Sequence, residues 1–553
     1  MTIPWELTDI NATLAYSARV DIHWNVTYVE VDRDGLGVRK AIGVNGQLPI
    51  PPVYATVGDT LFLQVHNSLD KTTSIHAHGI LQNNTNFMDG AAMVTQCGIP
   101  PGQSLTYEYY LHQPGTFWLH GHDHHQNSDG LRTALVVYDR EAPPYKYDDE
   151  YLFSLEDWFA LDYDERIQSS LNLLTTVPAP STFPTGLING VLGNFTKPIA
   201  FAPKKTYRIR LVNMASTLWF QFSIAGHKLS LIEADGVYSN PLPVDGLEIT
   251  PGQRYSVLVT ADDTDQFNFN YNITMHASYI TSIKDLNPHY FMGIVEYRND
   301  APLKNVTMPD NFVIGKDIHM SALSGKPLLP ADRQISLTIG GGQFAEGIYH
   351  ALINNITYAQ AKVPTLYSAL TMGELSSNST IYGLNTNAII LRYLEHVEVV
   401  IRNTHYEPHP IHLHGHSFQV IEYGPLEIFT PSFVPLVKPS VDPNIREIRY
   451  TGPVPMSRDS ILVPQGQYIK IRFQADNPGA WVLHCHLDLH FGLGMAATFV
   501  AAPELLQGGF FKVPSKMLEQ CQAQGIAVSG NAAGNQGFDM TGLPEIKPEK
   551  IVS

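Results

Sequence analysis

Ten histidines and one cysteine gather in four short clusters of the 553-residue sequence. The clusters are His76-Ala-His78, His120-Gly-His122, His409-Pro-Ile-His412-Leu-His414, and His484-Cys485-His486 followed by His490. On a β-strand, residues i and i+2 point to the same face, so a His-x-His pair presents two imidazoles together. Imidazole suits copper, zinc, iron and nickel. One such pair alone is most often a surface feature, but four of them predict metal sites.

The cysteine at 485 sets its cluster apart from the other three. On a strand its side chain points away from those of its two histidine neighbours, so one strand can serve metal sites on both faces. Two histidines, a thiolate and a weak axial methionine form the blue-copper arrangement. The residues available for it are His409, Cys485, His490 and Met495. The plainer alternative is a buried thiol among structural histidines.

The elements that must position these clusters are predicted to be strands. Alternating apolar and polar runs, rich in β-branched and aromatic residues and bounded by Gly, Pro or Asn, indicate strands. Such runs occupy residues 60–65, 131–137, 207–212, 255–259 and 468–473. Short helices are expected near 164–174 and 366–375. Many short strands predict an all-β protein built of β-sandwiches or Greek-key barrels.

Length and an internal repeat divide the chain. A chain of this size suggests about three or four domains. In residues 54–78 and again in 393–412, a strand rich in Val and Leu runs to Asn and a histidine cluster follows, whereas the similar strand at 207–213 has no cluster after it. Connections near Arg140 and Ala301 contain proline or charges, as expected of boundaries. We predict three related β domains, with metal chemistry on the first and third: residues 1–140, 141–300 and 301–553.

Charge and targeting signals limit the partners and the compartment. The net charge of −17 disfavours nucleic acid and anionic membranes as partners. No run approaches the roughly 20 apolar residues that cross a bilayer. The first residues lack the features of a secretory signal, which leaves either an intracellular protein or a mature form. Glycosylation sequons favour a secreted glycoprotein; they begin at Asn11, Asn25, Asn83, Asn194, Asn272, Asn305, Asn355 and Asn378.

At these motifs the sequence resembles the three-domain multicopper oxidases, which include laccases, ascorbate oxidases and fungal ferroxidases. All four histidine motifs stand in the family's order, and the flanking residues 86–100, 115–122 and 477–490 also look alike. The resemblance covers nearly the whole chain and is nearest to ascomycete laccase-like enzymes. It implies three cupredoxin-like Greek-key domains, of which the second holds no copper and forms a wall of the substrate pocket.

The resemblance also implies four copper ions and assigns their ligands. The mononuclear type 1 copper takes His409, Cys485 and His490, with Met495 at the axial position. The type 2 copper takes His76 and His412. The type 3 pair takes two sets of three histidines, namely His78, His120 and His486, and His122, His414 and His484.

Four further residues receive roles from the same resemblance. Asp89 and Asp488 match acidic residues that supply protons for the reduction of dioxygen, although Asp89 in Asp-Gly is otherwise an ordinary turn residue. Cys97 and Cys521 match a disulfide that ties the first domain to the C-terminal tail. Three cysteines cannot all pair within one chain, and this pairing leaves Cys485 for copper and indicates an oxidising compartment.

The implied function is that of a laccase-like oxidoreductase. It couples one-electron oxidation of phenolic or other aromatic donors to four-electron reduction of dioxygen to water. A small aromatic donor docks beside an exposed His490 and its electron passes through Cys485 to the neighbouring histidines. We expect a secreted monomer whose partners are this donor and dioxygen.

The substrate residues depart from the family patterns. Laccases often carry an acid before a Leu-Ile-Asn-Gly stretch, where this chain has Pro184, and fungal iron oxidases carry an aspartate where it has His405. Glu407 lies close and can substitute in part for either acid, although its ordinary role would be a solvated loop charge. The alternatives are an ascorbate oxidase or ferroxidase, an electron-transfer protein without turnover, and cupredoxin domains used for adhesion.

Overall fold

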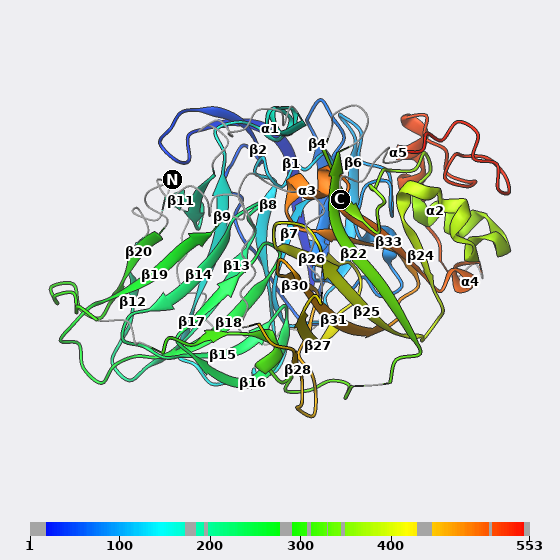
Figure 1. Cartoon of the computed structure of the whole chain (residues 1–553). Helices are drawn as coiled ribbons and strands as arrows, with labels where there is room; N and C mark the ends of the chain where they lie inside the picture. Colours follow the sequence, from blue (N-terminus) through cyan, green and yellow to red (C-terminus); the bar gives the residue numbers. More distant parts are fainter. Residues whose placement is uncertain are drawn as a thin grey trace.

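The computed structural model describes nine stretches of the chain. They are residues 18–171, 184–192, 197–276, 290–306, 311–328, 330–343, 349–427, 445–507 and 511–546. Strands dominate this part of the chain, and they form six sheets that follow one another as three pairs (Figure 1). The predicted all-β fold is therefore confirmed.

The first pair of sheets is built from residues 19–138. One sheet has the order β2 (Arg39–Val44), β1 (Arg19–Val31), β4 (Thr60–Asn67) and β6 (Ser104–Tyr110). The other has the order β3 (Val53–Thr56), β8 (Arg132–Tyr138), β7 (Gly115–Gly121) and β5 (Ile75–His78). The first two histidine clusters lie on β5 and at the end of β7.

The second pair of sheets carries none of the four clusters. One sheet has the order β11 (Val191–Leu192), β10 (Thr185–Ile188), β9 (Asp149–Trp158), β13 (Thr206–Asn213), β18 (Arg254–Thr260), β15 (Leu229–Ala234) and β16 (Val237–Val244). The other has the order β12 (Ile199–Ala200), β20 (Tyr290–Glu296), β19 (Phe269–His276), β14 (Trp219–Ile224), β17 (Gly246–Ile249) and β21 (Ile314–Gly315). Because β21 pairs with β17, residues beyond 300 pack with this pair. The division at residues 140 and 300 stays a prediction.

The third pair of sheets holds the remaining clusters. One sheet has the order β23 (Tyr349–Ile353), β22 (Arg333–Gln343), β25 (His396–Asn403), β31 (Gln467–Gln474), β27 (Phe418–Pro425) and β28 (Ile448–Arg449), with β29 (Ser457–Arg458) on β27. The other has the order β24 (Ala388–Leu391), β33 (Ala496–Ala501), β32 (Gly479–Cys485), β26 (His409–Leu413) and β30 (Ser460–Val463). The clusters lie on β26 and at the end of β32, which are neighbours.

A shared strand order explains the repeat in the sequence. In each pair the opening strand runs parallel to a later strand, β1 with β4, β9 with β13 and β22 with β25. The facing sheet repeats this, with β3 on β8, β12 on β20 and β24 on β33. Period-two burial fixes the inner face, as on β31, where Ile469, Ile471 and Phe473 are buried between half-exposed neighbours.

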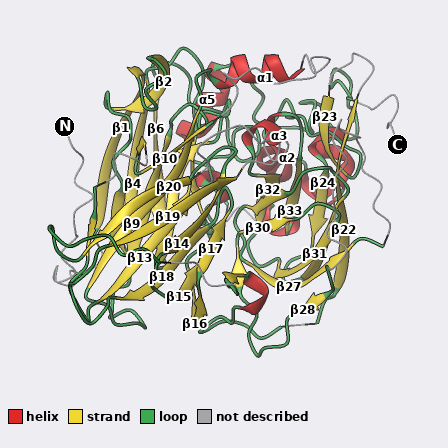
Figure 2. Ribbon diagram, turned by 60° about the vertical axis from the view of Figure 1, so that its left-hand side comes forward, coloured by secondary structure: helices red, strands yellow, loops and turns green. Residues whose placement is uncertain are grey.

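Helices are few and short in the described residues (Figure 2). They are α1 (Tyr163–Leu171), α2 (Thr365–Thr371), α3 (Asp488–Gly492), α4 (Pro503–Leu506) and α5 (Ser515–Ala523). The first two lie where the sequence predicted helices. None of the helices in these stretches is long and apolar enough to cross a membrane.

The disulfide between Cys97 and Cys521 joins the loop before β6 to α5, as predicted. Replacing both cysteines by serine is expected to lower the free energy of unfolding by about 2–5 kcal/mol, because the bond closes a very long loop in the unfolded chain. Thermal unfolding of the variant and the parent, each under oxidising and reducing conditions, measures this. Equal midpoints for the two oxidised proteins would contradict it.

Buried carboxylates make the fold sensitive to acid. Burial alone would raise the pKa of Glu233, but Arg208 and Arg210 outweigh it and hold the pKa below its ordinary value. A lowered folded pKa stabilises the protein above the unfolded pKa of about 4.3, and this stability is lost as pH falls through the folded value. We expect Glu233→Gln to unfold at a lower temperature than the parent at pH 6, and the gap to shrink towards pH 3. A gap that does not change with pH would contradict this pairing.

Candidate metal centre

The smaller of two clusters lies inside the third pair of sheets. The Sγ atom of Cys485 is 3.5 Å from Nδ1 of His409 and 3.8 Å from Nδ1 of His490, and these two nitrogens are 3.2 Å apart. All three side chains are buried. Burial raises the pKa of the Cys485 thiol, so the thiolate needs a bound cation to offset the cost of its charge. The group is therefore suited to a thiolate-binding metal.

The outer nitrogens of the two histidines point at different partners. Nε2 of His490 is 3.0 Å from a carboxylate oxygen of Glu407. Nε2 of His409 is 2.9 Å from Nδ1 of His405, whose other nitrogen contacts the hydroxyl of Tyr349. Burial, and then the charge of His490, hold the pKa of His405 well below its ordinary value. His409 thus has a neutral imidazole as its partner, whereas His490 has a side-chain carboxyl group.

Two expectations about this region were wrong. His490 is 7% exposed rather than open to solvent, and Glu407 is 3% exposed rather than a solvated loop charge. The carboxylate of Glu407 lies on His490, so that it covers the edge of the imidazole where a donor was expected to dock.

Met495 lies beside the thiolate cluster, whereas Pro184 lies in the second pair of sheets. Met495 is fully buried, and its N–H donates to the carbonyl of His490 while its carbonyl accepts from the N–H of Cys485. The axial role of its sulfur stays a prediction. Pro184 is half-buried directly before β10 of the second pair of sheets, and its part in a substrate pocket is likewise a prediction.

The larger cluster brings eight histidines together where the first and third pairs of sheets meet. Strand pairing sets His76 beside His120 and His412 beside His484. Ring stacking across the interface joins His76 to His414 and His78 to His412, with centroids 3.9 and 3.7 Å apart. The eight residues are His76, His78, His120, His122, His412, His414, His484 and His486, and all but His122 are buried. Hereafter they are called the histidine cage.

One nitrogen of most cage histidines is tied to protein oxygen. Backbone carbonyls accept from Nδ1 of His76, His120, His412 and His484 at 2.7–3.1 Å. The opposite atoms, Nε2 of His76, His120 and His412, are buried without a hydrogen-bond partner among the described residues. Burial lowers the pKa of His120 and His412 well below the ordinary value, so these rings are neutral. Orphaned, neutral imidazole nitrogens that face one another fit bound metal ions.

Several groups of three side chains within the cage could each hold a metal ion. The ligand atoms of His122, His414 and His484 lie within 4.8 Å of one another, as do those of His76, His412 and His414. A third set contains His76, His78 and His120, and Nε2 of His486 is 3.2 Å from Nδ1 of His78. One of these sets matches a ligand set that the resemblance implies, whereas His76 and His414 are each shared between two sets, so the assignment of ligands to each metal stays a prediction.

The two predicted acids lie near different histidines of the cage. Asp89 is fully buried, its carboxylate accepts from Nδ1 of His414 at 2.9 Å, and its carbonyl accepts from His76. Asp488 accepts from Ser128 at 2.6 Å and from Asn127 at 3.2 Å. Burial raises the pKa of Asp488 to about 6, although these two hydrogen bonds act to lower it. Asp89 therefore orients two rings, and Asp488 is a carboxyl group able to carry a proton.

A cavity of about 280 Å³ leads to the cage beside Asp488. Its lining includes His120, His122 and His484 at the inner end and His124, which is exposed. The space is large enough for several water molecules or for dioxygen. The cavity joins the cage to the surface on the side of Asp488.

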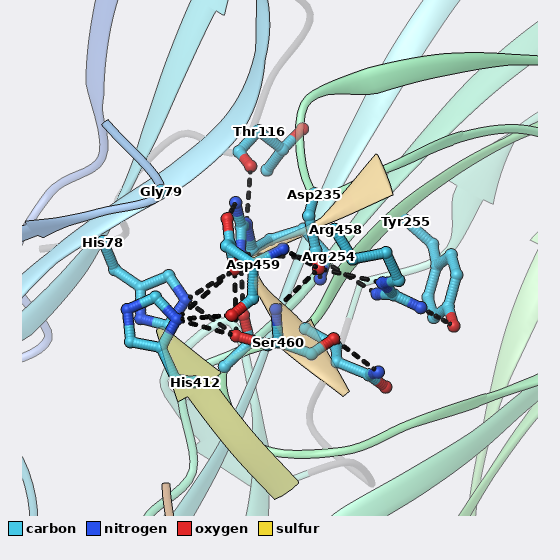
Figure 3. A network of polar contacts seen from close by, with 12 residues as sticks. His78, Gly79, Thr116, Asp235, Arg254, Tyr255, His412, Arg458, Asp459 and Ser460 are labelled. Carbon is cyan, nitrogen blue, oxygen red and sulfur yellow. Dashed lines mark hydrogen bonds and ion pairs between the residues drawn. The ribbon is translucent and has the colours of Figure 1, made fainter. Parts of the chain in front are cut away.

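Asp459 was missed by the sequence reasoning. Its carboxylate accepts from Nε2 of His78 at 3.1 Å and its carbonyl accepts from Nδ1 of His412 at 2.8 Å (Figure 3). Nothing in the sequence distinguishes this aspartate from others that precede a strand. It becomes recognisable only when β30 is seen paired with β26.

Comparison with known proteins identifies the family. Profiles of multicopper oxidase domains match residues 25–142, 149–300 and 358–504. The chain belongs to the multicopper oxidase family. As a multicopper oxidase it is a copper-dependent oxidoreductase with dioxygen as acceptor.

Several relatives of this multicopper oxidase are named for iron. The "iron multicopper oxidase fer1" of Mycosarcoma maydis is 36% identical over 96% of this chain and 88% of its own length. The "iron transport multicopper oxidase fetC" of Epichloe festucae is 37% identical over 94% of this chain and 82% of its own length.

Solved structures show the same fold. The crystal structure of Fet3p, described as "a multicopper oxidase that functions in iron import", matches with a TM-score of 0.85 and 30% identity over 96% of this chain and 99% of that one. The laccase of Botrytis aclada matches with a TM-score of 0.75 and 27% identity over 94% of each chain.

Proposed function

We propose that this multicopper oxidase holds four copper ions and takes its electrons from Fe(II). The observation that carries the choice of donor is the buried carboxylate of Glu407, 3.0 Å from Nε2 of His490. A carboxylate binds a cation, and here it lies against the imidazole of a residue of the thiolate cluster. A negative charge attracts Fe(II), whereas a neutral aromatic donor gains no charge attraction from it.

The copper assignment follows the geometry. His409, Cys485 and His490 would hold the single copper, and the histidine cage would hold the other three. Copper bound at these residues supplies one-electron redox chemistry at the thiolate and the reduction of dioxygen in the cage. The complete cage argues against a simple electron carrier, which needs only one metal.

The residues then divide the work. Glu407 binds Fe(II), and its 3.0 Å contact with His490 gives the electron a short path inward. Cys485 is covalently joined to His484 and His486, so the same strand connects both clusters. The net charge of −17 favours the approach of a cation over that of an anionic donor such as ascorbate. Four Fe(II) ions supply the electrons that turn one dioxygen and four protons into two waters.

Asp488 is proposed to deliver protons along the cavity. Replacing it by asparagine keeps the size of the side chain and its acceptor oxygen but removes the proton. Turnover is expected to fall by about 10- to 1,000-fold, while anaerobic bleaching of the blue colour by Fe(II) stays at the parent rate. Stopped-flow bleaching and oxygen uptake separate the two steps. A variant that turns over like the parent would remove Asp488 from the mechanism.

The names of the relatives support an iron substrate over the phenolic one expected from the sequence. One observation still favours an aromatic donor as a second candidate. Fungal iron oxidases carry an aspartate where this chain has His405. Here the neutral His405 contacts His409, the other histidine of the thiolate cluster, and the hydroxyl of Tyr349. The aromatic donor therefore remains the alternative that the experiment must test.

Oxygen uptake with different donors tests the proposal. The copper-loaded protein is supplied with Fe(II), a diphenol, an aminophenol or ascorbate at matched concentrations, and consumption of dioxygen is recorded. We expect the largest kcat/KM with Fe(II), at four Fe(II) oxidised per dioxygen. A dominant rate on the diphenol would overturn the choice of donor but not the copper assignment.

We also propose that the enzyme works as a monomer in an oxidising, extracellular setting. The disulfide supports this compartment. Exposed sequon asparagines support glycosylation, and they are Asn25, Asn83, Asn305, Asn355 and Asn378. The sequons at Asn11 and Asn194 lie outside the described residues. Mass spectrometry before and after glycan removal measures how many are occupied.

A further inference from the structure

A buried ion pair connects the second pair of sheets to the histidine cage (Figure 3). Two nitrogens of Arg254, at the start of β18, donate to the two carboxylate oxygens of Asp459, each at 2.6 Å. Arg254 is 0% exposed and Asp459 is 5% exposed. Bidentate pairs of this kind fix the orientation of both planar groups. The second pair of sheets carries none of the four clusters, yet it determines how Asp459 is turned.

Asp459 passes this orientation on to the cage. Oδ1 of Asp459, one of the two oxygens that accept from Arg254, also accepts from Nε2 of His78 at 3.1 Å and from the hydroxyl of Ser460 at 2.9 Å. A carboxylate accepts hydrogen bonds, so the proton of the His78 ring resides on Nε2. Its Nδ1 is then the free nitrogen, and it is the atom that lies 3.2 Å from Nε2 of His486. His78 therefore makes its hydrogen bond to a protein oxygen through Nε2, whereas four other cage histidines make theirs through Nδ1, namely His76, His120, His412 and His484.

The arginine itself has little freedom. Its Nε donates to the carbonyl of Thr116 at 2.9 Å, and one terminal nitrogen also donates to the carbonyl of Gly252 at 2.9 Å. A second bidentate pair, Arg458 with Asp235 at 2.9 and 3.0 Å, lies beside the first. The N–H of Arg254 donates to Asp235 at 2.8 Å, which locks the two pairs together.

Two glycines let the three pairs of sheets meet at this point. A Cβ on Gly79 would come within 2.3 Å of a terminal nitrogen of Arg254 and 3.0 Å of Asp459. A Cβ on Gly252 would come within 2.9 Å of His486 and 3.1 Å of His78. Both residues have φ near +90°, where glycine is favoured. The turn before β18 therefore lies directly against the cage.

We propose that Arg254 is a positioning residue for the histidine cage: through Asp459 it keeps the proton of His78 on Nε2 and so presents Nδ1 to copper. The inference rests on the copper assignment proposed above. Oxygens that hold the second nitrogen of a metal-binding histidine set its tautomer and ring orientation. The second pair of sheets thus takes part in copper binding through charge and geometry rather than through ligands.

Arg254→Lys is the decisive variant, because lysine keeps the charge but cannot make the two parallel hydrogen bonds. We expect the blue absorption of the thiolate site to stay at the parent intensity. Copper in the cage is expected to be held about 10- to 100-fold more weakly, with a smaller near-ultraviolet shoulder and a changed electron paramagnetic resonance spectrum. Copper per chain is measured during titration with a chelator.

Arg33→Lys is the matched control. Arg33 is also buried and pairs with Glu156 across the first and second pairs of sheets at 3.0 Å, and within the described residues Glu156 makes its polar contacts with Arg33, Arg132 and Ser154 rather than with a cage histidine. This variant is expected to lose stability and keep the parent's copper content and spectra. Equal changes in the two variants would reduce Arg254 to a structural role and overturn the proposal.

Two further results keep the test decisive. Where Arg254→Lys does not fold, Asp459→Asn has the same size and must give the same spectral change, and an unchanged cage spectrum overturns the proposal. The parent is titrated in parallel. A parent without copper in the cage would sink the copper assignment itself, whereas a fully loaded parent with an unchanged Arg254→Lys would sink only this inference.

Discussion

Replacing Cys485 by serine is expected to remove the blue colour of the copper-loaded enzyme. Turnover on every donor is expected to fall by more than about 100-fold, because loss of a residue that only supports a metal ligand already costs about 10- to 100-fold and Cys485 is proposed as a ligand itself. The thiolate is the soft ligand of the small cluster and the covalent link to His484 and His486. A serine hydroxyl has a poor affinity for copper and offers no such path. Absorption spectra and oxygen uptake with Fe(II) and with a diphenol measure both effects.

The other two cysteines provide the matched control. The variant with serine at Cys97 and Cys521 removes the disulfide and leaves the metal-binding thiol unchanged. It is expected to keep its blue colour and its rate per copper while losing stability. A Cys485→Ser protein that stays blue, or turns over at the parent's rate, would contradict the assignment of both clusters.

Spacing along strands made the clusters predictable. His-x-His places two imidazoles on one face wherever a strand forms, and the apolar runs around residues 60–65 and 468–473 indicated strands. This was enough to predict that the two histidines of each pair can bind metal from the same face of a strand. The family resemblance then supplied the division into metals and the pairing of Cys97 with Cys521.

Contacts between distant elements could not be predicted in this way. The orientation of Glu407 towards His490 depends on the loop between β25 and β26 folding over α3. Loop conformation has no period, so exposure was the ordinary expectation for a glutamate and it was wrong. Arg254 and Asp459 are 205 residues apart and meet only when the second and third pairs of sheets pack. Each looks unremarkable in its own segment.

The position of Glu407 leads to the second large effect, a loss that is selective for iron. Glutamine at 407 keeps the length of the side chain and can still accept from Nε2 of His490, but it carries no charge. Two unit charges at about 4 Å interact by about 4 kcal/mol at an effective dielectric of 20, an upper limit for this site. Because water weakens this interaction, we expect kcat/KM for Fe(II) to fall roughly 10- to 100-fold. For a neutral diphenol the change should stay within about threefold.

Comparing the donors separates recognition from electron transfer. If Glu407 served only to orient His490, Glu407→Gln would slow Fe(II) and the diphenol alike and shift the blue absorption. Glu398→Gln is the control, since Glu398 is also a buried glutamate of the third pair of sheets, but its partners are Arg472 and Gln334 rather than a residue of the thiolate cluster. It should leave both rates unchanged. Equal slowing of both donors by Glu407→Gln would leave the carboxylate without a role in choosing iron, and the aromatic alternative would then be the better account of this enzyme.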